Sequence, residues 1–252
     1  MSVAVIIPVR NMADTLERAV TSAAGADEIH VIDDASDDNI SEVMPRLPLR
    51  VTYWRWPVKS RCHLAAQRTV YEATKCRHII GMGADDVLMP GFVDAVRKHA
   101  DTPVIFTDYA VADNDGNVLD GVSQEVAEAT TLTAKQMRAR LCSDRNATES
   151  GIGSSLRSDV ADWLWQHQWE VMGPHMDSIG YAAAAATFGC LLLPFVGAVY
   201  TYGRTSFGRD NMKTAEDFRR VGGICRHWLA TVGMDDATTR ALCLKRCHVT
   251  WS

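Results

Sequence analysis

Residues 3–36 read VAVIIPVRNMADTLERAVTSAAGADEIHVIDDAS, and this stretch decides the fold class. It opens with an apolar, mostly β-branched run over residues 3–9, which is typical of a buried strand. Residues 11–24 follow with apolar side chains at helical spacing, and residues 28–32 form a second short apolar run. A strand, a helix and a strand in so short a stretch predict two parallel strands joined by a helix.

The same alternation continues along the chain. Further strands are expected at residues 49–54, 78–82 and 104–107, and further helices at 62–75, from Pro90 onward, and at 134–141, 159–168, 178–188, 212–232 and 236–247. Residues 113–117, Asp-Asn-Asp-Gly-Asn, predict the tip of a hairpin. We therefore predict an α/β fold, with a Rossmann-like, mostly parallel central sheet flanked by helices and a helical C-terminal extension.

Composition limits the class of protein further. The chain has 252 residues, 47% of them hydrophobic, which is enough for one sizeable core. No apolar run of 18 residues and no signal peptide are visible, so we expect no integral membrane segment. The 7 cysteines are widely spaced and are expected as reduced thiols in a cytoplasmic protein. A net charge of −5 argues against a protein that coats nucleic acid.

Two acidic pairs follow predicted strands. Asp33-Asp34 comes after the second strand, and Asp85-Asp86 comes after the strand at 78–82. In parallel sheets, ligands bind beyond the carboxyl ends of the strands. Both pairs are therefore expected at the ligand-binding edge of the sheet.

Each pair has a functional and a purely structural interpretation. Asp85 and Asp86 offer hard oxygen ligands for Mg²⁺ or Mn²⁺, and the alternative is that one of them caps the helix near Pro90. A carboxylate of Asp33 or Asp34 can accept a hydrogen bond from a pyrimidine N–H or a ribose hydroxyl. The alternative for Asp33-Asp34 is an ordinary turn, because the residues after it favour turns.

Three motifs in this order resemble family 2 glycosyltransferases. They are the opening VIIPVRN at 5–11, the strand end EIHVIDDAS at 28–36 and GADD at 83–86. The resemblance is clear over residues 3–110 and thinner beyond. It implies a GT-A fold and an inverting transfer of sugar from a nucleotide-diphosphate donor to an acceptor hydroxyl. UDP is the first choice of nucleotide, with dTDP and GDP as alternatives.

The resemblance also assigns roles to residues that could contact the donor. Asp34 would read the base, with Asp33 as the second candidate, and Asp85 would be the direct ligand of Mn²⁺ or Mg²⁺ with Asp86 beside it. The family's first metal-motif aspartate is replaced here by Gly83. The other residues expected along the nucleotide sugar are Pro8, Val9, Asn11, Arg61 and Ala84.

The general base is expected in the second half of the chain. Residues 169–177, WEVMGPHMD, resemble the region where the family carries a Glu-Asp pair at the start of a helix. Asp177 is the predicted base. His175 takes the place of the usual Glu and either orients Asp177 or acts as the base itself. The structural alternative for Asp177 is an N-cap of a helix that starts at Ser178.

The resemblance divides the chain into a GT-A domain at 1–203 and a lid with a helical extension at 204–252. Within the domain, 1–110 would bind the nucleotide sugar and 111–203 the acceptor. The acceptor could be a glycan, a lipid-linked glycan, a small molecule or modified nucleic acid, and no structural partner is predicted. The alternative function is a non-catalytic nucleotide-sugar-binding module, because Gly83 replaces an aspartate. A nucleotidyltransferase is disfavoured because no glycine-rich loop follows the first strand.

Overall fold

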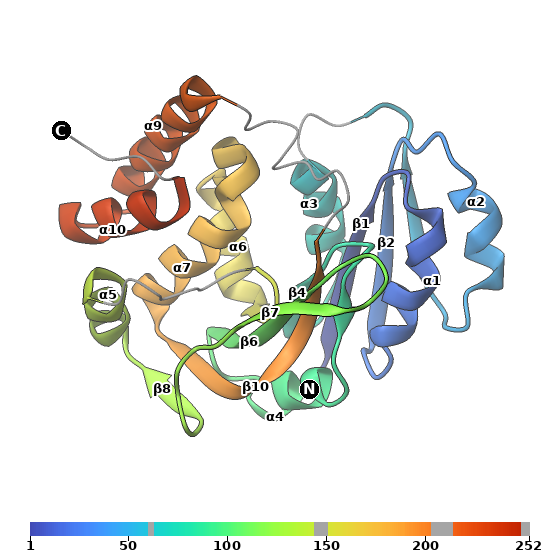
Figure 1. The fold of residues 1–252 in the computed structure, drawn as a ribbon, viewed down its shortest axis with the longest axis horizontal. Helices are drawn as coiled ribbons and strands as arrows, with labels where there is room; N and C mark the ends of the chain where they lie inside the picture. The colour runs from blue at the N-terminus through green and yellow to red at the C-terminus, as the bar shows by residue number, and fades with distance from the viewer. Residues whose placement is uncertain (60–62, 144–150, 203–213, 248–252) are drawn as a thin grey trace.

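The protein is built around one mixed sheet of 10 strands (Figure 1). The computed structural model describes residues 1–59, 63–143, 151–202 and 214–247. The strand order is β3-β2-β1-β4-β9-β6-β10-β5, with β7 paired to β6 and β8 paired to β10. Helices cover both faces of this sheet.

The N-terminal half of the sheet is parallel. Its strands are β1 (Val3–Val9), β2 (Glu28–Asp34), β3 (Thr52–Trp56) and β4 (His78–Gly81). β1 lies between β2 and β4 and pairs with both in parallel. It is apolar throughout because its two faces are both buried: Val5 and Ile7 pack with the helix α1, whereas Ile6 packs with the helix α3.

The helices of this half, with their bounds, are α1 (Ala13–Ser22), α2 (Ile40–Val43), the 3₁₀ turn η1 (Met44–Arg46), α3 (His63–Ala73) and α4 (Phe92–Lys98). Leu16, Ala19 and Val20 give α1 its fully buried stripe at helical spacing. α1 and α3 therefore hold the parallel strands between them.

The second half of the sheet is mostly antiparallel. Its strands are β5 (Val87–Leu88), β6 (Val104–Ala112), β7 (Val118–Val122), β8 (Thr130–Leu132), β9 (Ser154–Arg157) and β10 (Cys190–Thr201). β9 lies between β4 and β6 and is antiparallel to both. β10 runs parallel to β6 and antiparallel to β5. The predicted α/β fold is confirmed, and the predicted hairpin tip at 113–117 joins β6 to β7.

Helices of the second half pack in a group on one side of the sheet (Figure 1). They are α5 (Ala134–Ser143), α6 (Ser158–Gln166), the 3₁₀ segment η2 (Trp169–His175), α7 (Met176–Phe188), α9 (Ala215–Thr231) and α10 (Asp236–Cys247). α7 lies in the middle of the group, and its five alanines at 182–186 are all fully buried. Their small side chains allow the neighbouring elements to approach closely. Among the described residues, no helix has both the length and the apolarity of a membrane span.

His78 is a buried ionisable residue at the amino end of β4. Its Nε2 lies 3.0 Å from the carbonyl oxygen of Ala100, so this nitrogen donates, and Nδ1 lies 3.2 Å from Ser155 Oγ. The ring therefore links β4, β9 and the segment after α4 as a neutral imidazole. Burial is the main reason that the pKa of His78 is lowered to about 4 from its ordinary 6.5.

We expect acid to destabilise the protein partly through His78. The unfolded chain binds a proton at this residue below pH 6.5 and the folded chain only below about 4, so unfolding takes up a proton between these values. The free energy of unfolding should fall by roughly 3 kcal/mol across this window from His78 alone. Urea unfolding at several pH values should show a smaller fall for His78→Gln. Parallel pH curves for the variant and the wild type would contradict this assignment.

Candidate active site

Four loops meet at one edge of the sheet. The parallel strands β1, β2 and β4 place residues 10–12, 34–38 and 82–86 at their shared carboxyl edge. β9 is antiparallel to β4, with Leu156 opposite Ile79, so its amino end lies at the same edge. The loop before β9, with Gly151, therefore joins the three loops of the N-terminal half.

The loops after β1 and β2 are locked together by hydrogen bonds. Arg10 Nη1 donates to the carbonyl oxygens of Asp34 (2.7 Å) and Ala35 (2.9 Å). The backbone N–H of Asn11 donates to Ser36 Oγ at 3.1 Å, and Asn11 Oδ1 accepts from the N–H of Asp37 at 2.8 Å. Asn11 and Ala35 both have a φ of 52°, a left-handed conformation that is strained for a residue with a Cβ. The mutual hydrogen bonds hold both residues in this conformation.

The carboxylate of Asp33 is bonded to other side chains and to the backbone of the protein. It is fully buried, accepts from the Ser36 N–H (2.8 Å) and the Tyr53 hydroxyl (2.7 Å), and pairs with Arg55 Nη1 at 3.2 Å. Burial, followed by this bond to Asp33, raises the pKa of Tyr53 to about 12. Asp34, the first choice of base reader, is also buried, at 6% exposed, and ends β2 at the edge of the sheet.

Asp86 also directs its carboxylate inward. It is 6% exposed, its Oδ2 accepts from the N–H of Gly83 at 3.1 Å, and its Oδ1 accepts from the N–H of Thr201 at 3.0 Å. The helix that follows, α4, starts at Phe92 with Gly91 as its N-cap, so the alternative in which Asp85 or Asp86 caps this helix is wrong. Asp86 instead ties the loop after β4 to the end of β10.

Asp85 is half-buried, and its main chain is held from two sides. Its carbonyl oxygen accepts from Thr201 Oγ1 at 2.5 Å and from Arg18 Nη2 at 2.9 Å. Ala84, between Gly83 and Asp85, is buried. The loop that carries the predicted metal ligand is therefore fixed by α1 and β10.

Asp85 and Asp86 lie close enough to repel each other. Burial and then repulsion from Asp85 raise the pKa of Asp86 to about 7, although its two backbone donors act in the opposite direction. In the described part of the chain, no three His, Cys, Asp or Glu side chains form a complete metal cage. A Mg²⁺-type site needs none, because substrate phosphates and water supply most of the oxygens. Asp85 thus fits the role of a single carboxylate ligand.

Gly83 is tightly enclosed by the same carboxylates. A Cβ at this position would lie 2.8 Å from Asp85 Oδ1 and 2.8 Å from Asp86 Oδ2. The Asp85 oxygen is the far end of a side chain. The Asp86 carboxylate is held at both oxygens, because Oδ2 accepts from the Gly83 N–H and Oδ1 accepts from the Thr201 N–H. A side chain at this position would therefore press on both carboxylates.

Asp177 lies in the first turn of α7, which starts at Met176, so it does not precede the helix as the N-cap alternative required. Its Oδ1 accepts from the N–H of Ser178 at 2.7 Å. A Cβ on Gly151 would lie 3.0 Å from the Asp177 Cβ, so the two backbones approach closely there. This contact brings Asp177 to the loop before β9 and thus to the edge that carries the acidic loops.

Tyr181 lies one helical turn beyond Asp177, and its ring is buried. Burial, then the neighbouring Tyr71 and Asp177, raise the pKa of Tyr181 well above its usual value. Of the remaining predicted residues, Pro8 and Val9 end β1 at this edge. Arg61 and the side chain of His175 lie outside the described residues.

Three contacts at this edge of the sheet could not be predicted from the sequence. Thr201 and Arg18 hold the loop of Asp85, and Gly151 contacts Asp177. Each lies far along the chain from the residue that it touches. Only the sheet topology brings them together.

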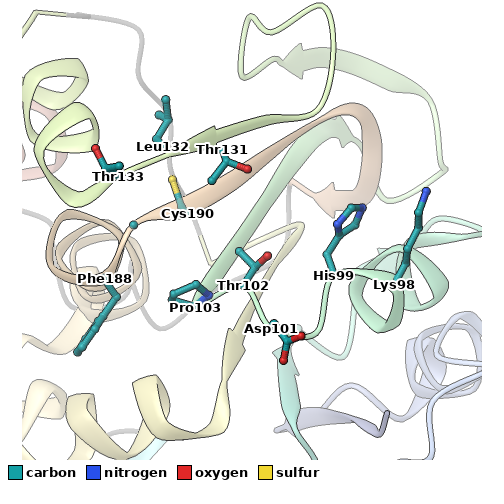
Figure 2. A pocket seen from close by; sticks show the side chains of 11 residues that line it. Lys98, His99, Asp101, Thr102, Pro103, Thr131, Leu132, Thr133, Phe188 and Cys190 are labelled. Carbon is teal, nitrogen blue, oxygen red and sulfur yellow. The ribbon is translucent and has the colours of Figure 1, made fainter.

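A separate hollow of about 510 Å³ lies at the opposite edge of the sheet (Figure 2). Its lining comes from the end of α4, the segments that lead into β6 and β10, and the junction of β8 with α5. Lys98, His99 and Phe188 are among the side chains around it. None of the predicted site residues that the structure describes lines this hollow.

Comparison with solved structures identifies the fold. Crystal structures of S. aureus TarS are similar to almost the whole chain. Its fragment 1–349 in complex with UDP-GlcNAc gives a TM-score of 0.72 at 14% identity, covering 96% of this chain and 70% of that one. The fragment with UDP gives 0.69 at 16%, with coverages of 96% and 70%, and the longer TarS chain gives 0.67 at 15%, with coverages of 96% and 42%. This likeness shows a GT-A fold, as the sequence predicted.

The family is shown by sequence. The model of glycosyl transferase family 2 matches residues 4–162, so the chain belongs to this family. A search of curated protein sequences gives no significant match. The match includes every loop described above except those of Thr201 and Asp177.

We expect Gly83→Ala to destabilise the protein, because the new methyl group would press on the fixed Asp86 carboxylate. Overpacking of this kind costs roughly 1–3 kcal/mol of unfolding free energy, measured by urea denaturation. Gly121→Ala in β7 is the matched control, since a Cβ there meets no atom within 4 Å. A Gly83→Ala protein as stable as the wild type would show that Asp86 can move.

Proposed function

We propose that the protein transfers a sugar from a nucleotide-diphosphate donor, with a UDP-sugar as the first choice, to an acceptor hydroxyl with inversion. The observation that carries the proposal is the meeting of three features at one sheet edge. These are the acidic loop after β2, the acidic loop after β4 and the contact of Asp177 with Gly151. Donor-binding and base functions can then act on one bound substrate.

The donor would lie along the ends of β1 and β2. Asp34, at the end of β2, would accept a hydrogen bond from the base, as the resemblance to family 2 implies, and Asp33 is the second candidate. Asn11 is exposed in the locked loop after β1, where it can contact the nucleotide. Pro8, Val9 and Arg61 complete the predicted nucleotide contacts. The UDP and UDP-GlcNAc complexes of S. aureus TarS support UDP as the nucleotide to test first.

Asp85 would hold Mn²⁺ or Mg²⁺, with Asp86 beside it, and the bound ion would neutralise charge on the diphosphate leaving group. Both oxygens of Asp86 accept backbone hydrogen bonds, so we assign direct ligation to Asp85. We assign the side chain of Asp85 to the cation, because its carbonyl oxygen accepts from Arg18 and Thr201.

Asp177 would act as the general base. The acceptor hydroxyl loses its proton to the Asp177 carboxylate while its oxygen bonds to the anomeric carbon of the sugar. The bond from that carbon to the diphosphate oxygen breaks on the opposite side, which inverts the configuration. The N–H of Ser178 orients the carboxylate, and His175 is the second candidate for the base.

The acceptor is a glycan, a lipid-linked glycan, a small molecule or modified nucleic acid, and a cytoplasmic location is a prediction from the sequence. The second candidate function is a non-catalytic nucleotide-sugar-binding module. The observation that favours it is Gly83, which provides no carboxylate at the first position of the metal motif. Turnover distinguishes the two, because a binding module holds UDP-sugars without releasing UDP.

Asp85→Ala should abolish metal-dependent donor binding, because the variant loses the only carboxylate that we assign to the cation. The measurement is calorimetric titration with UDP, dTDP and GDP, each with and without Mn²⁺. Asp101→Ala, at an exposed carboxylate on the opposite edge of the sheet, is the matched control. UDP binding by Asp85→Ala with unchanged Mn²⁺ dependence would remove Asp85 from the site.

Asp177→Asn should keep donor affinity and reduce turnover by roughly 10²–10⁴, the usual contribution of a general base. Asparagine preserves the size of the side chain and its acceptor for the Ser178 N–H. The readout is the initial rate of UDP release from UDP-sugars, with water and added hydroxyl compounds as acceptors. Turnover close to that of the wild type would assign the base to another residue, with His175 tested next.

A further inference from the structure

We propose that Thr201, at the carboxyl end of β10, is a positioning residue of the donor site. Its hydroxyl holds the main chain at Asp85, and its backbone N–H holds the side chain of Asp86 in the same loop. The inference rests on the proposed function, because its effect is read through metal-dependent nucleotide binding.

The geometry of Thr201 supports this role directly. The residue is 4% exposed. Its Oγ1 donates to the carbonyl oxygen of Asp85 at 2.5 Å, and its N–H donates to Asp86 Oδ1 at 3.0 Å. One residue therefore contacts two consecutive residues of the loop, and one of these is the proposed metal ligand.

No other described contact replaces the hydroxyl fully. Arg18 Nη2 also donates to the Asp85 carbonyl oxygen, at 2.9 Å, but this arginine is exposed. An exposed, long side chain holds a partner weakly, because solvent competes and the side chain loses entropy when it is fixed. The buried Thr201 hydroxyl is short and rigid by comparison.

The strand pairing explains why Thr201 can fix this loop. β5 follows Asp86 directly and pairs with β10 through Val87 opposite Val199 and Leu88 opposite Ala198. The N–H of Met89 adds a bond to the Gly197 carbonyl at 2.9 Å. β5 has only two residues, so the position of the loop depends on the position of β10.

β10 is itself held in a defined register beside β6. Its pairing with β6 shifts twice, between Leu193 and Val196 and between Val196 and Ala198. At Gly197 the strands are so close that a Cβ would lie 2.2 Å from Thr107 Oγ1. Such irregularities fix register and direct the strand end. The register of β10 therefore determines the position of Thr201, and the hydroxyl of Thr201 in turn positions the main chain at Asp85.

The test compares Thr201→Val with Thr201→Ser. Valine keeps the shape and the backbone N–H to Asp86 but removes the hydroxyl, whereas serine keeps the hydroxyl. The measurement is calorimetric titration of Mn²⁺ into each folded protein with UDP present, with thermal unfolding as the check on folding. Thr131→Val, at an exposed threonine of β8, is the matched control.

We expect Thr201→Val to weaken Mn²⁺ binding by roughly 10–100-fold, the usual effect of losing a group that orients a metal ligand. Thr201→Ser and Thr131→Val should stay close to the wild type. Wild-type Mn²⁺ affinity in Thr201→Val would overturn the inference and leave the proposed function intact. Equal losses in the Val and Ser variants would also overturn it, because the hydroxyl would not be the cause. A wild type without Mn²⁺-dependent UDP binding would overturn the proposed function and this role with it.

Discussion

The candidate site depends on one buried carboxylate. Asp86 is almost fully removed from solvent, and burying a charge is costly unless strong hydrogen bonds replace water. The N–H groups of Gly83 and Thr201 provide this replacement from opposite sides. Because the two donors belong to different parts of the chain, their shared acceptor fixes the loop after β4 against the last strand. This bridge adds to the pairing of β5 with β10 and to the bond from the Thr201 hydroxyl to the Asp85 carbonyl oxygen.

In each of the two acidic pairs, one aspartate has a structural role. In the first pair, Asp33 binds Ser36, Tyr53 and Arg55 and shapes the loop. In the second pair, Asp86 accepts from backbone groups. The neighbouring carboxylates, Asp34 and Asp85, are the ones that we assign to the substrate and its cation. In each pair, we thus assign a structural role to one aspartate and a role in donor binding to its neighbour.

Local patterns in the sequence were enough to predict the parallel half of the fold and the edge that carries the acidic loops. β1 has the predicted bounds, because its residues are apolar on both faces and a turn follows at once. β9 was missed because its residues 154–157, Ser-Ser-Leu-Arg, alternate in no regular way and form a strand only between β4 and β6. β5 is too short to have a pattern. Thr201 and Gly151 were missed because their contacts depend on pairing between distant segments.

The order of strands in the sheet has a consequence for how the chain is made. During synthesis β1, β2, β3 and β4 can pair as soon as they emerge, but the free side of β4 receives its partner only when residues 154–157 follow. β5 can pair only after β10, which ends at Thr201, has been synthesised. An unfinished chain therefore exposes a strand edge that other chains can pair with. The acidic loop after β4 is translated early, yet it can reach its final shape only near the end of translation.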